Sequence, residues 1–271
     1  MVTVLTSRDN PIIKTVISLQ RKRGRQKHRL FLAEGPHLLE EALRSSFKVR
    51  NVLVKEGASC SGPLGELVKT HGVPVYQVSA RLFPALTETQ TPQDVLAVVE
   101  QPGEAGSFPS VGPDFCALLL HQIQDPGNLG TIMRTAWAAG VTNLFITPGT
   151  VDPYGGKVVR SSQGGIFNLH LYFQTLEAIL EWARAHGVKV WVGDPRANKL
   201  YFEQDLTGPT LFLLGNEARG FEWTKLDQDW GIAGVRIPVP GGAESLNVSI
   251  SAAILIYEAL RQRLTGTGRE G

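Results

Sequence analysis

The stretch that decides the fold is DFCALLLHQIQDPGNLGTIMRTAWAAG, residues 114–140. Its first nine residues contain an unbroken apolar run, 115–120, and predict a buried strand, after which the pattern predicts a helix from about Asn128 to Gly140. One stripe of this helix carries the apolar or small residues Leu129, Ile132, Met133, Ala136 and Gly140. Arg134 therefore points away from the buried face. A buried strand followed by an amphipathic helix is the repeating unit of a parallel α/β sheet.

The same alternation continues to the end of the chain. Further strands are expected at TNLFIT (142–147), VKVWVG (188–193), TLFLLG (210–215) and GVRIPV (234–239). Helices are expected near GKVVRSS (156–162), at TLEAILEWARAHG (175–187) and in the last apolar segment. Near-continuous apolar strands that alternate with helices predict an α/β fold, with a mostly parallel sheet covered by helices on both faces. In such sheets ligands bind beyond the carboxyl ends of the strands.

The first hundred residues predict a smaller α/β domain. Its expected elements are a helix at GPHLLEEALRSS (35–46) and strands at RNVLVK (50–55), VPVYQV (73–78) and DVLAVV (94–99). The segment EQPGEAGSFPSVGPD (100–114) is rich in Pro and Gly and predicts a linker. The length of 271 residues suits two domains. We therefore expect domains at 1–100 and 114–271, joined by a linker at 101–113.

The charge is small in total but unevenly distributed. The net charge is +2, from 27 Lys and Arg against 25 Asp and Glu, yet the first fifty residues hold eleven basic and four acidic residues. The run KTVISLQRKRGRQKHR, residues 14–29, contains seven Lys or Arg and no acid. A solvated helix face would explain a charged run, but such faces usually mix signs. An unmixed basic run also suits the phosphate backbone of a nucleic acid.

Several protein classes are disfavoured by composition. The sequence has no apolar run long enough to span a membrane and no apolar core of a secretory signal, so we expect a cytoplasmic protein without a membrane partner. Cys60 and Cys116 are isolated, and no His lies at metal-pair spacing, which argues against a disulfide framework and against a metal site. The glycine fingerprints of dinucleotide and phosphate loops and the G-x-S-x-G elbow do not occur.

Three junctions in the second half carry small polar sets. The first contains Asn128 and Arg134, and the second is LFLLGNEARGF (211–221), where Glu217 follows a buried strand. The third is GGAESLNVSISAAILIYEAL (241–260), where Ser245 and Asn247 stand at the start of a helix. Taken singly, these are a surface arginine, a polar turn and a helix cap. Placed at one edge of one sheet, the same side chains would form a site.

In order and nearly letter for letter, the three junctions resemble the motifs of the SpoU branch of the SPOUT RNA methyltransferases, over about residues 115–263. The resemblance implies transfer of a methyl group from S-adenosylmethionine to a ribose 2′-hydroxyl, a deep trefoil knot in the catalytic domain, and a homodimer. A second resemblance, over residues 28–99, is to a ribosomal-protein-like RNA-binding domain. This domain favours ribosomal RNA over tRNA as substrate.

The resemblance also implies roles for single residues. The catalytic set would be Arg134, Asn128, Glu217, Ser245 and Asn247. The backbone around Gly215, Ile237 and Leu246 would hold the cofactor. Ser245 and Asn247 would contact the ribose or orient Arg134, either within one subunit or from the partner, and Asn247 would also cap its helix.

Two hypotheses for Arg134 stay open. As a general base it would have to be neutral, which costs about 7 kcal/mol near pH 7 because the arginine pKa exceeds 12. The preferred hypothesis is that Arg134 binds a phosphate and stabilises the developing alkoxide, while water or Glu217 accepts the proton.

Other functions compete with this one. They are a tRNA ribose methyltransferase, an RNA-binding factor without catalysis, and a methyltransferase for a base nitrogen or a small molecule. For Arg160 and Ser161, a position facing RNA or the dimer partner and a structural role are both open.

Overall fold

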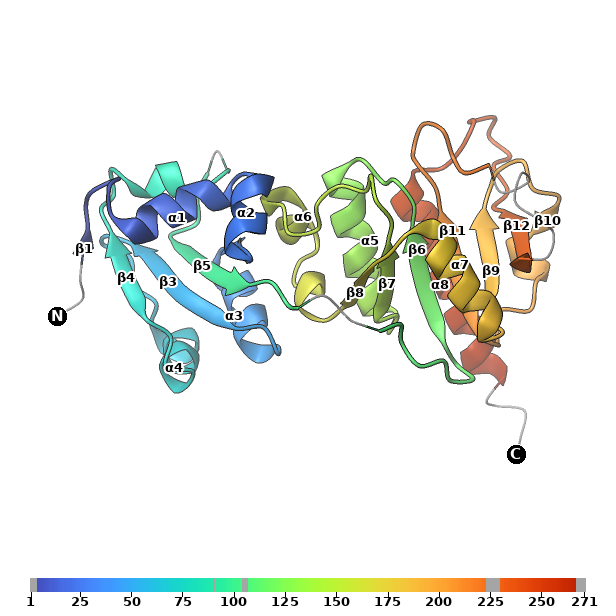
Figure 1. The fold of residues 1–271 in the computed structure, drawn as a ribbon, viewed down its shortest axis with the longest axis horizontal. Coiled ribbons are helices and arrows are strands. Elements are labelled where there is room, and N and C mark those ends of the chain that lie inside the picture. Colours follow the sequence, from blue (N-terminus) through green and yellow to red (C-terminus); the bar gives the residue numbers. More distant parts are fainter. Residues whose placement is uncertain (1–3, 90, 104–106, 223–229, 267–271) are drawn as a thin grey trace. The chain divides into compact units, whose positions relative to one another are not determined.

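The computed structural model describes residues 4–89, 91–103, 107–222 and 230–266. The chain divides into two compact units (Figure 1). Unit 1 consists of Met1–Gly103 and Asp152–Asn168, and unit 2 consists of Glu104–Val151 and Leu169–Gly271. Each unit has its own sheet. No helix in the described part of the chain is long and apolar enough to cross a membrane.

Unit 1 is built on a five-stranded sheet in the order β1-β4-β3-β5-β2. The strands are β1 (Val4–Leu5), β2 (Leu30–Glu34), β3 (Val49–Lys55), β4 (Val75–Val78) and β5 (Val95–Glu100). Strand β5 is antiparallel to both of its neighbours, and the other pairs are parallel. The helices are α1 (Pro11–Leu19), α2 (Lys22–His28), α3 (Pro36–Arg44), α4 (Gly62–Thr70) and α6 (Gly156–Ser161). Short 3₁₀ turns lie at η1 (Phe83–Leu86) and η2 (Gly165–Phe167).

The basic run 14–29 is helical for most of its length. Asn10 caps α1 by accepting the N–H of Ile12, and Ile13, Val16 and Leu19 are buried along one side of the helix. In the sequence, charged residues lie between and after these three apolar residues, so their helical spacing is difficult to recognise. The run is therefore anchored in the core of unit 1 through its apolar residues.

Segment 152–168 packs within unit 1, although it lies between two strands of the second sheet in sequence. Phe31 of β2 stacks against Phe167 with ring centroids 6.0 Å apart and lies 5.1 Å from the ring of Tyr154. Arg25 forms a buried ion pair with Asp152 at 2.8 Å. Apolar and ionic contacts thus hold the segment against the first sheet.

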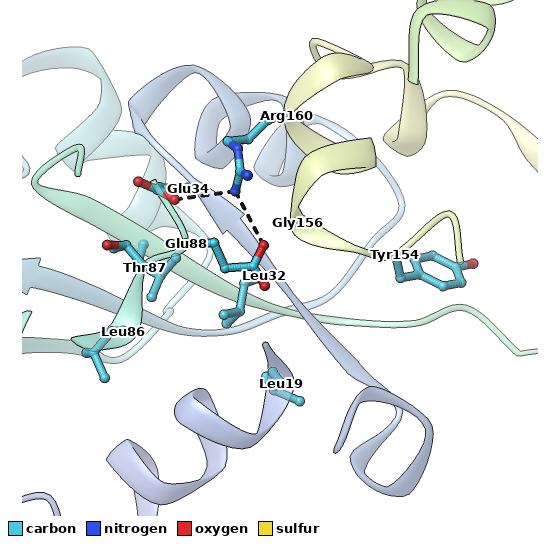
Figure 2. A pocket seen from close by; sticks show the side chains of 10 residues that line it. Leu19, Leu32, Glu34, Leu86, Thr87, Glu88, Tyr154, Gly156 and Arg160 are labelled. Atoms are coloured by element: carbon cyan, nitrogen blue, oxygen red, sulfur yellow. Dashed lines mark ion pairs between the residues drawn. The ribbon is translucent and has the colours of Figure 1, made fainter. Parts of the chain in front are cut away.

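Arg160, at the end of this segment's helix α6, points towards two acidic residues. Its guanidinium lies 3.6 Å from Glu34 and 3.8 Å from Glu88 (Figure 2). Glu34 is buried and also accepts hydrogen bonds from the Thr89 hydroxyl and the N–H of Gln93. Arg160 therefore balances the charge of two acidic side chains, of which Glu34 is buried.

Unit 2 contains a seven-stranded sheet in the order β10-β12-β9-β11-β6-β7-β8, in which every pair is parallel. The strands are β6 (Cys116–Leu120), β7 (Asn143–Ile146), β8 (His170–Phe173), β9 (Lys189–Gly193), β10 (Lys199–Leu200), β11 (Thr210–Leu214) and β12 (Ile232–Arg236). The helices are α5 (Pro126–Ala138), α7 (Leu176–Ala185) and α8 (Val248–Gly266), with a 3₁₀ turn η3 (Tyr201–Glu203). The predicted α/β fold with a mostly parallel sheet is confirmed.

Helices cover both faces of this sheet. Helix α7 packs Trp182 and its neighbours onto one face, where Trp182 stacks on Phe108 at 5.3 Å and contacts Phe145 at 5.0 Å. Helix α8 packs against α5 and against β11. The central strands are buried on both sides, so the polar residues that follow them mark the carboxyl edge of the sheet.

Candidate functional site

A cleft of about 430 Å³ lies at the carboxyl edge of the second sheet. Its lining residues follow three neighbouring strands and begin one helix. They are Gly193–Arg196 after β9, Leu214–Phe221 at the end of β11, Val235, Ile237 and Val239 around the end of β12, and Glu244–Val248 before α8, with Asn128 and Ser251. The volume falls within the range of about 300–1,000 Å³ that is usual for small-molecule sites.

The turn after β11 brings the backbone close to itself. A Cβ atom on Gly215 would lie 2.5 Å from the carbonyl oxygen of Gly220, so no larger residue fits there without a backbone shift. The Asn216 side-chain oxygen accepts the N–H groups of Ala218 and Arg219, and the Gly220 N–H donates to the Asn216 carbonyl at 2.8 Å. The asparagine thus closes the turn that presents Glu217.

Glu217 is the main acceptor of the site. Its carboxylate accepts the backbone N–H groups of Gln124, at 3.0 Å, and of Asp125, at 3.1 Å. It also accepts the side-chain amide of Asn128 at 3.1 Å. Burial alone raises the pKa of the Glu217 carboxyl, but these hydrogen bonds outweigh burial and bring its pKa below the ordinary value. Glu217 is therefore held as a carboxylate.

Asn128 stands in the first turn of α5. Asp125 caps this helix, because its side chain accepts the Asn128 N–H at 2.8 Å, and Pro126 follows at the first helical position. The cap fixes the start of the helix next to the turn after β11. The Asn128 side chain is thereby directed at Glu217.

Asn247 joins the third junction to the first. Its side-chain NH₂ donates to the side-chain oxygen of Asn128 at 2.9 Å. Its side-chain oxygen accepts the N–H of Ser249 at 2.8 Å and the Ser249 hydroxyl at 2.6 Å. Asn247 therefore caps α8 and contacts the site at the same time, as the sequence suggested.

The direction of these hydrogen bonds is fixed at both ends. The Ser249 N–H can only donate, so the Asn247 oxygen must face it and the Asn247 NH₂ must face Asn128. At the other end the Glu217 carboxylate can only accept, so Asn128 presents its NH₂ there. We call the chain of contacts Ser249–Asn247–Asn128–Glu217 the amide relay.

The structure brings together most of the residues singled out in the sequence. Seven of them line the one cleft: Asn128, Gly215, Glu217, Ile237, Ser245, Leu246 and Asn247. Arg134 does not line it. Arg134 is exposed on α5, two residues beyond the buried Ile132, and within the described residues its side chain has no hydrogen-bond or ion-pair partner. Its guanidinium is available to a ligand or a partner chain.

A fourth polar junction at this edge was missed in the sequence. Asp194 directly follows β9, is 7% exposed, and lines the cleft. Arg196 donates to both of its carboxylate oxygens, at 3.0 and 3.1 Å. The signal was present, because GDPR follows the apolar strand VKVWV in the same way that GNE follows TLFLL. Among the described residues, no group of three or more His, Cys, Asp or Glu side chains could hold a metal ion.

Two family profiles match separate parts of the chain. The SpoU rRNA Methylase family matches residues 116–257, and the MRM3-like substrate binding domain matches residues 10–97. Together they cover most of both units.

Whole-length relatives have related activities. The chain is 36% identical to the 23S rRNA (guanosine(2553)-2′-O)-methyltransferase RlmP of Bacillus subtilis, over 93% of this chain and 97% of the relative. It is 32% identical to the 23S rRNA (uridine(2479)-2′-O)-methyltransferase of Streptomyces viridochromogenes, over 97% and 93% of the two chains. The AdoMet-bound rRNA methyltransferase of Sinorhizobium meliloti superposes with a TM-score of 0.84 and 32% identity, covering 96% of this chain and 98% of that one.

Proposed function

Because the chain belongs to the SpoU rRNA methylase family and is an S-adenosylmethionine-dependent RNA 2′-O-ribose methyltransferase, we propose that the cleft at the carboxyl edge of the second sheet is its active site. The observation that carries this proposal is the amide relay, which ties the start of α8 to the start of α5 and to the turn after β11. Ribosomal RNA is the substrate class that the relatives indicate.

The residues around the cleft fit the cofactor. The close backbone approach at Gly215 leaves no room for a side chain, so peptide groups can face a ligand directly. Gly215, Ile237 and Leu246 come from three different segments of the cleft wall and would hold S-adenosylmethionine between them. When bound, the cofactor supplies a methyl group on a positively charged sulfur.

The reaction forms a bond between the ribose 2′-oxygen and the methyl carbon and breaks the bond from that carbon to sulfur. The three groups must lie nearly in line, so positioning carries much of the rate acceleration. The amide relay would hold Asn247 at a fixed distance from the cofactor wall, and Ser245 lines the same cleft two residues before it. These side chains would orient the ribose, whose hydroxyl proton passes to water.

Glu217 does not suit the role of proton acceptor. Its oxygens already accept three N–H donors, and its pKa is lowered, which makes it a weaker base. We propose that Glu217 is a positioning residue that holds the first junction, at Gln124–Asn128, against the second, the turn after β11. The sequence suggested two acceptors for the hydroxyl proton, water and Glu217, and water is the one that remains.

Arg134 would act as an anion-binding residue. Its charge would bind the phosphate next to the target nucleotide and stabilise negative charge that develops on the ribose oxygen. The general-base hypothesis requires a neutral guanidinium, and the exposed position of Arg134 offers no burial to favour that form.

In a homodimer, Arg134 of one subunit would lie near the cleft of its partner. The described part of α8 exposes Ile250, Tyr257 and Leu264, which are 49%, 47% and 67% exposed. Their spacing of seven residues puts them on one side of the helix, which is typical of a helix that packs against a partner. Because α5 packs against α8, a second subunit on this side would have Arg134 near it. The trefoil knot and the cytoplasmic location are further proposals that rest on the family.

The test is methyl transfer from labelled S-adenosylmethionine to unmodified 23S rRNA, 16S rRNA and tRNA transcripts, with the product mapped by nuclease digestion and mass spectrometry. We expect one ribose-methylated nucleotide in ribosomal RNA. Transfer to tRNA alone would replace the substrate proposal. Tight binding of RNA without transfer to any of the three would favour the factor without catalysis.

A further inference from the structure

The basic sequence RKRGRQKH at 21–28 is divided by helix α2 into two faces. Gly24 and Arg25 face inward, and a Cβ on Gly24 would lie 1.9 Å from the carbonyl oxygen of Ser18, so the glycine lets α2 pack against the end of α1. The exposed residues of the helix are Lys22, Arg23, Gln26 and Lys27. At about 100° per residue these four fall within an arc of about 140°, in which Arg23 and Lys27 lie about 160° from Arg25 and Lys22 lies about 60° from it.

Arg25 is the only one of the seven basic residues in the run that is buried, at 6% exposed. It donates to the carbonyl oxygens of Leu19 and Gln20 at 2.8 and 3.1 Å and forms the ion pair with Asp152. Its charge is thus balanced inside unit 1. Arg25 fixes the orientation of α2 and does not itself face solvent.

Two other basic residues of the run are also engaged. Lys14 pairs with Asp9 at 2.8 Å, and Arg29 donates to the carbonyl oxygen of Pro102 at 2.9 Å. In contrast, Arg21, Lys22, Arg23 and Lys27 are exposed and have no acidic partner within the described residues. Three of the four unpaired charges of the run therefore lie on one face of α2, and the fourth, Arg21, directly precedes the helix.

We infer that this outer face of α2, formed by Lys22, Arg23 and Lys27 with Gln26, binds the phosphate backbone of the substrate RNA. The inference rests on the proposed function, and it names the surface through which unit 1 would take hold of the RNA. The three cations lie within about 8 Å along the helix axis, at about 1.5 Å per residue, so they would contact neighbouring phosphates of one strand. Contacts of this kind bind without reading base sequence.

Salt-dependent binding tests the inference. The triple variant Lys22→Gln, Arg23→Gln, Lys27→Gln and the wild type would be titrated with an unmodified 23S rRNA transcript at several salt concentrations. Each lost phosphate contact lowers the slope of log affinity against log salt by about 0.7–0.9. We expect the slope to fall by about 2 to 3 and the affinity to fall about tenfold or more at low salt.

A matched control separates this surface from total charge. The variant Arg44→Gln, Lys55→Gln, Lys69→Gln removes three exposed cations from unit 1 that pair with Glu40, Asp94 and Glu66. Its slope should stay close to that of the wild type. An equal loss in the two triple variants, or an unchanged slope in the α2 variant, overturns the inference.

Two further measurements distinguish a failure of this inference from a failure of the proposed function. The α2 variant should bind S-adenosylmethionine as the wild type does and should regain methyl transfer at saturating RNA. Loss of transfer at every RNA concentration, in a variant whose thermal unfolding matches the wild type, would contradict a role confined to RNA binding. A wild type that transfers no methyl group refutes the proposed function, while the salt slopes still decide whether α2 binds RNA.

Discussion

The side-chain NH₂ of Asn247 donates to the side-chain oxygen of Asn128 at 2.9 Å, across 119 positions of sequence. Each of the two asparagines stands at the beginning of a helix, one at α8 and the other in the first turn of α5. Asn247 thus caps a helix and also contributes to the geometry of the proposed active site. Substitutions can separate these two roles.

Asn247→Asp should separate stability from activity. Aspartate still accepts the Ser249 N–H and caps α8, but it cannot donate to Asn128. We expect urea unfolding close to that of the wild type and methyl transfer about 100-fold slower, because the ribose is misplaced. Asn247→Ala should lose the activity and also about 1 kcal/mol of stability. Full activity of the Asp variant would show that the amide relay has no catalytic role.

Glu217→Gln should change the acid dependence of stability. The folded-state pKa of Glu217 is lowered, so its hydrogen bonds stabilise the fold above the ordinary pKa of 4.5, and this contribution is lost as the pH falls towards the folded value. The wild type should therefore lose more stability than the variant as the pH falls from 7 to well below 4.5, as measured by urea unfolding. The variant should be less stable at pH 7, because an NH₂ group would replace one of the two oxygens and face the N–H donor of either Gln124 or Asp125.

The pH profile of the Glu217→Gln variant gives a second outcome. With its pKa lowered, Glu217 does not titrate near neutrality, so residual activity between pH 6 and pH 9 should follow the wild-type curve in shape. Disappearance of a limb of that curve would restore Glu217 as the base.

Arg134→Lys should not restore activity. A lysine keeps the charge but cannot make the bidentate contact of an arginine with phosphate. We therefore expect methyl transfer to fall by about 100-fold or more, while binding of S-adenosylmethionine stays unchanged. Arg134→Ala should be slower still. High activity of the Lys variant, with a pH profile set by the lysine pKa, would instead support a general base at this position.

Gly215→Ala should weaken cofactor binding. The added Cβ would lie 2.5 Å from the Gly220 oxygen, so the turn must shift away from the geometry that lines the cleft. A shift that costs the bound form about 1–3 kcal/mol more than the free form lowers the affinity about tenfold to hundredfold. Gly241→Ala is the control, because a Cβ there meets nothing within 4 Å. Calorimetric titration with S-adenosylmethionine measures both, and equal affinities would remove Gly215 from the cofactor wall.

Arg25→Met should destabilise unit 1. The Arg25 and Asp152 side chains are 8% and 14% exposed, and loss of one partner of such a pair costs about 3–5 kcal/mol because it leaves the other charge buried. Hydrogen exchange of the amides in α1 and α2 would report the loss locally. Lys22→Met, on the outer face of α2, should leave that exchange unchanged.

The sequence predicted the second sheet better than the first. Strands buried on both sides appear as apolar runs, so β6, β9 and β11 could be recognised. Strands β8 and β10 are short edge strands with partly exposed residues, and they carry no such signal. Helices α1 and α2 were hidden because the charges of the basic run obscured its apolar spacing.

The residues of the candidate site could be named from the sequence, but the contacts among them could not be predicted. Motif resemblance named Asn128, Glu217 and Asn247, and the helical stripe placed Arg134 on the exposed side of α5, where it lies in the structure. The contacts among the motifs span 89 to 119 positions, and local patterns carry no information at that range. Their roles in catalysis stay predictions.

The amide relay also limits the order in which parts of the enzyme can fold during synthesis. Its link from Asn247 to Asn128 cannot form until the chain has been synthesised as far as Asn247 and α8 has docked, and contacts between such distant positions form slowly. A nascent chain that has already made the basic helix and most of the second sheet could therefore meet ribosomal RNA while it still lacks a closed active site. Recognition of RNA and competence to modify it would arise at different times during synthesis, in that order.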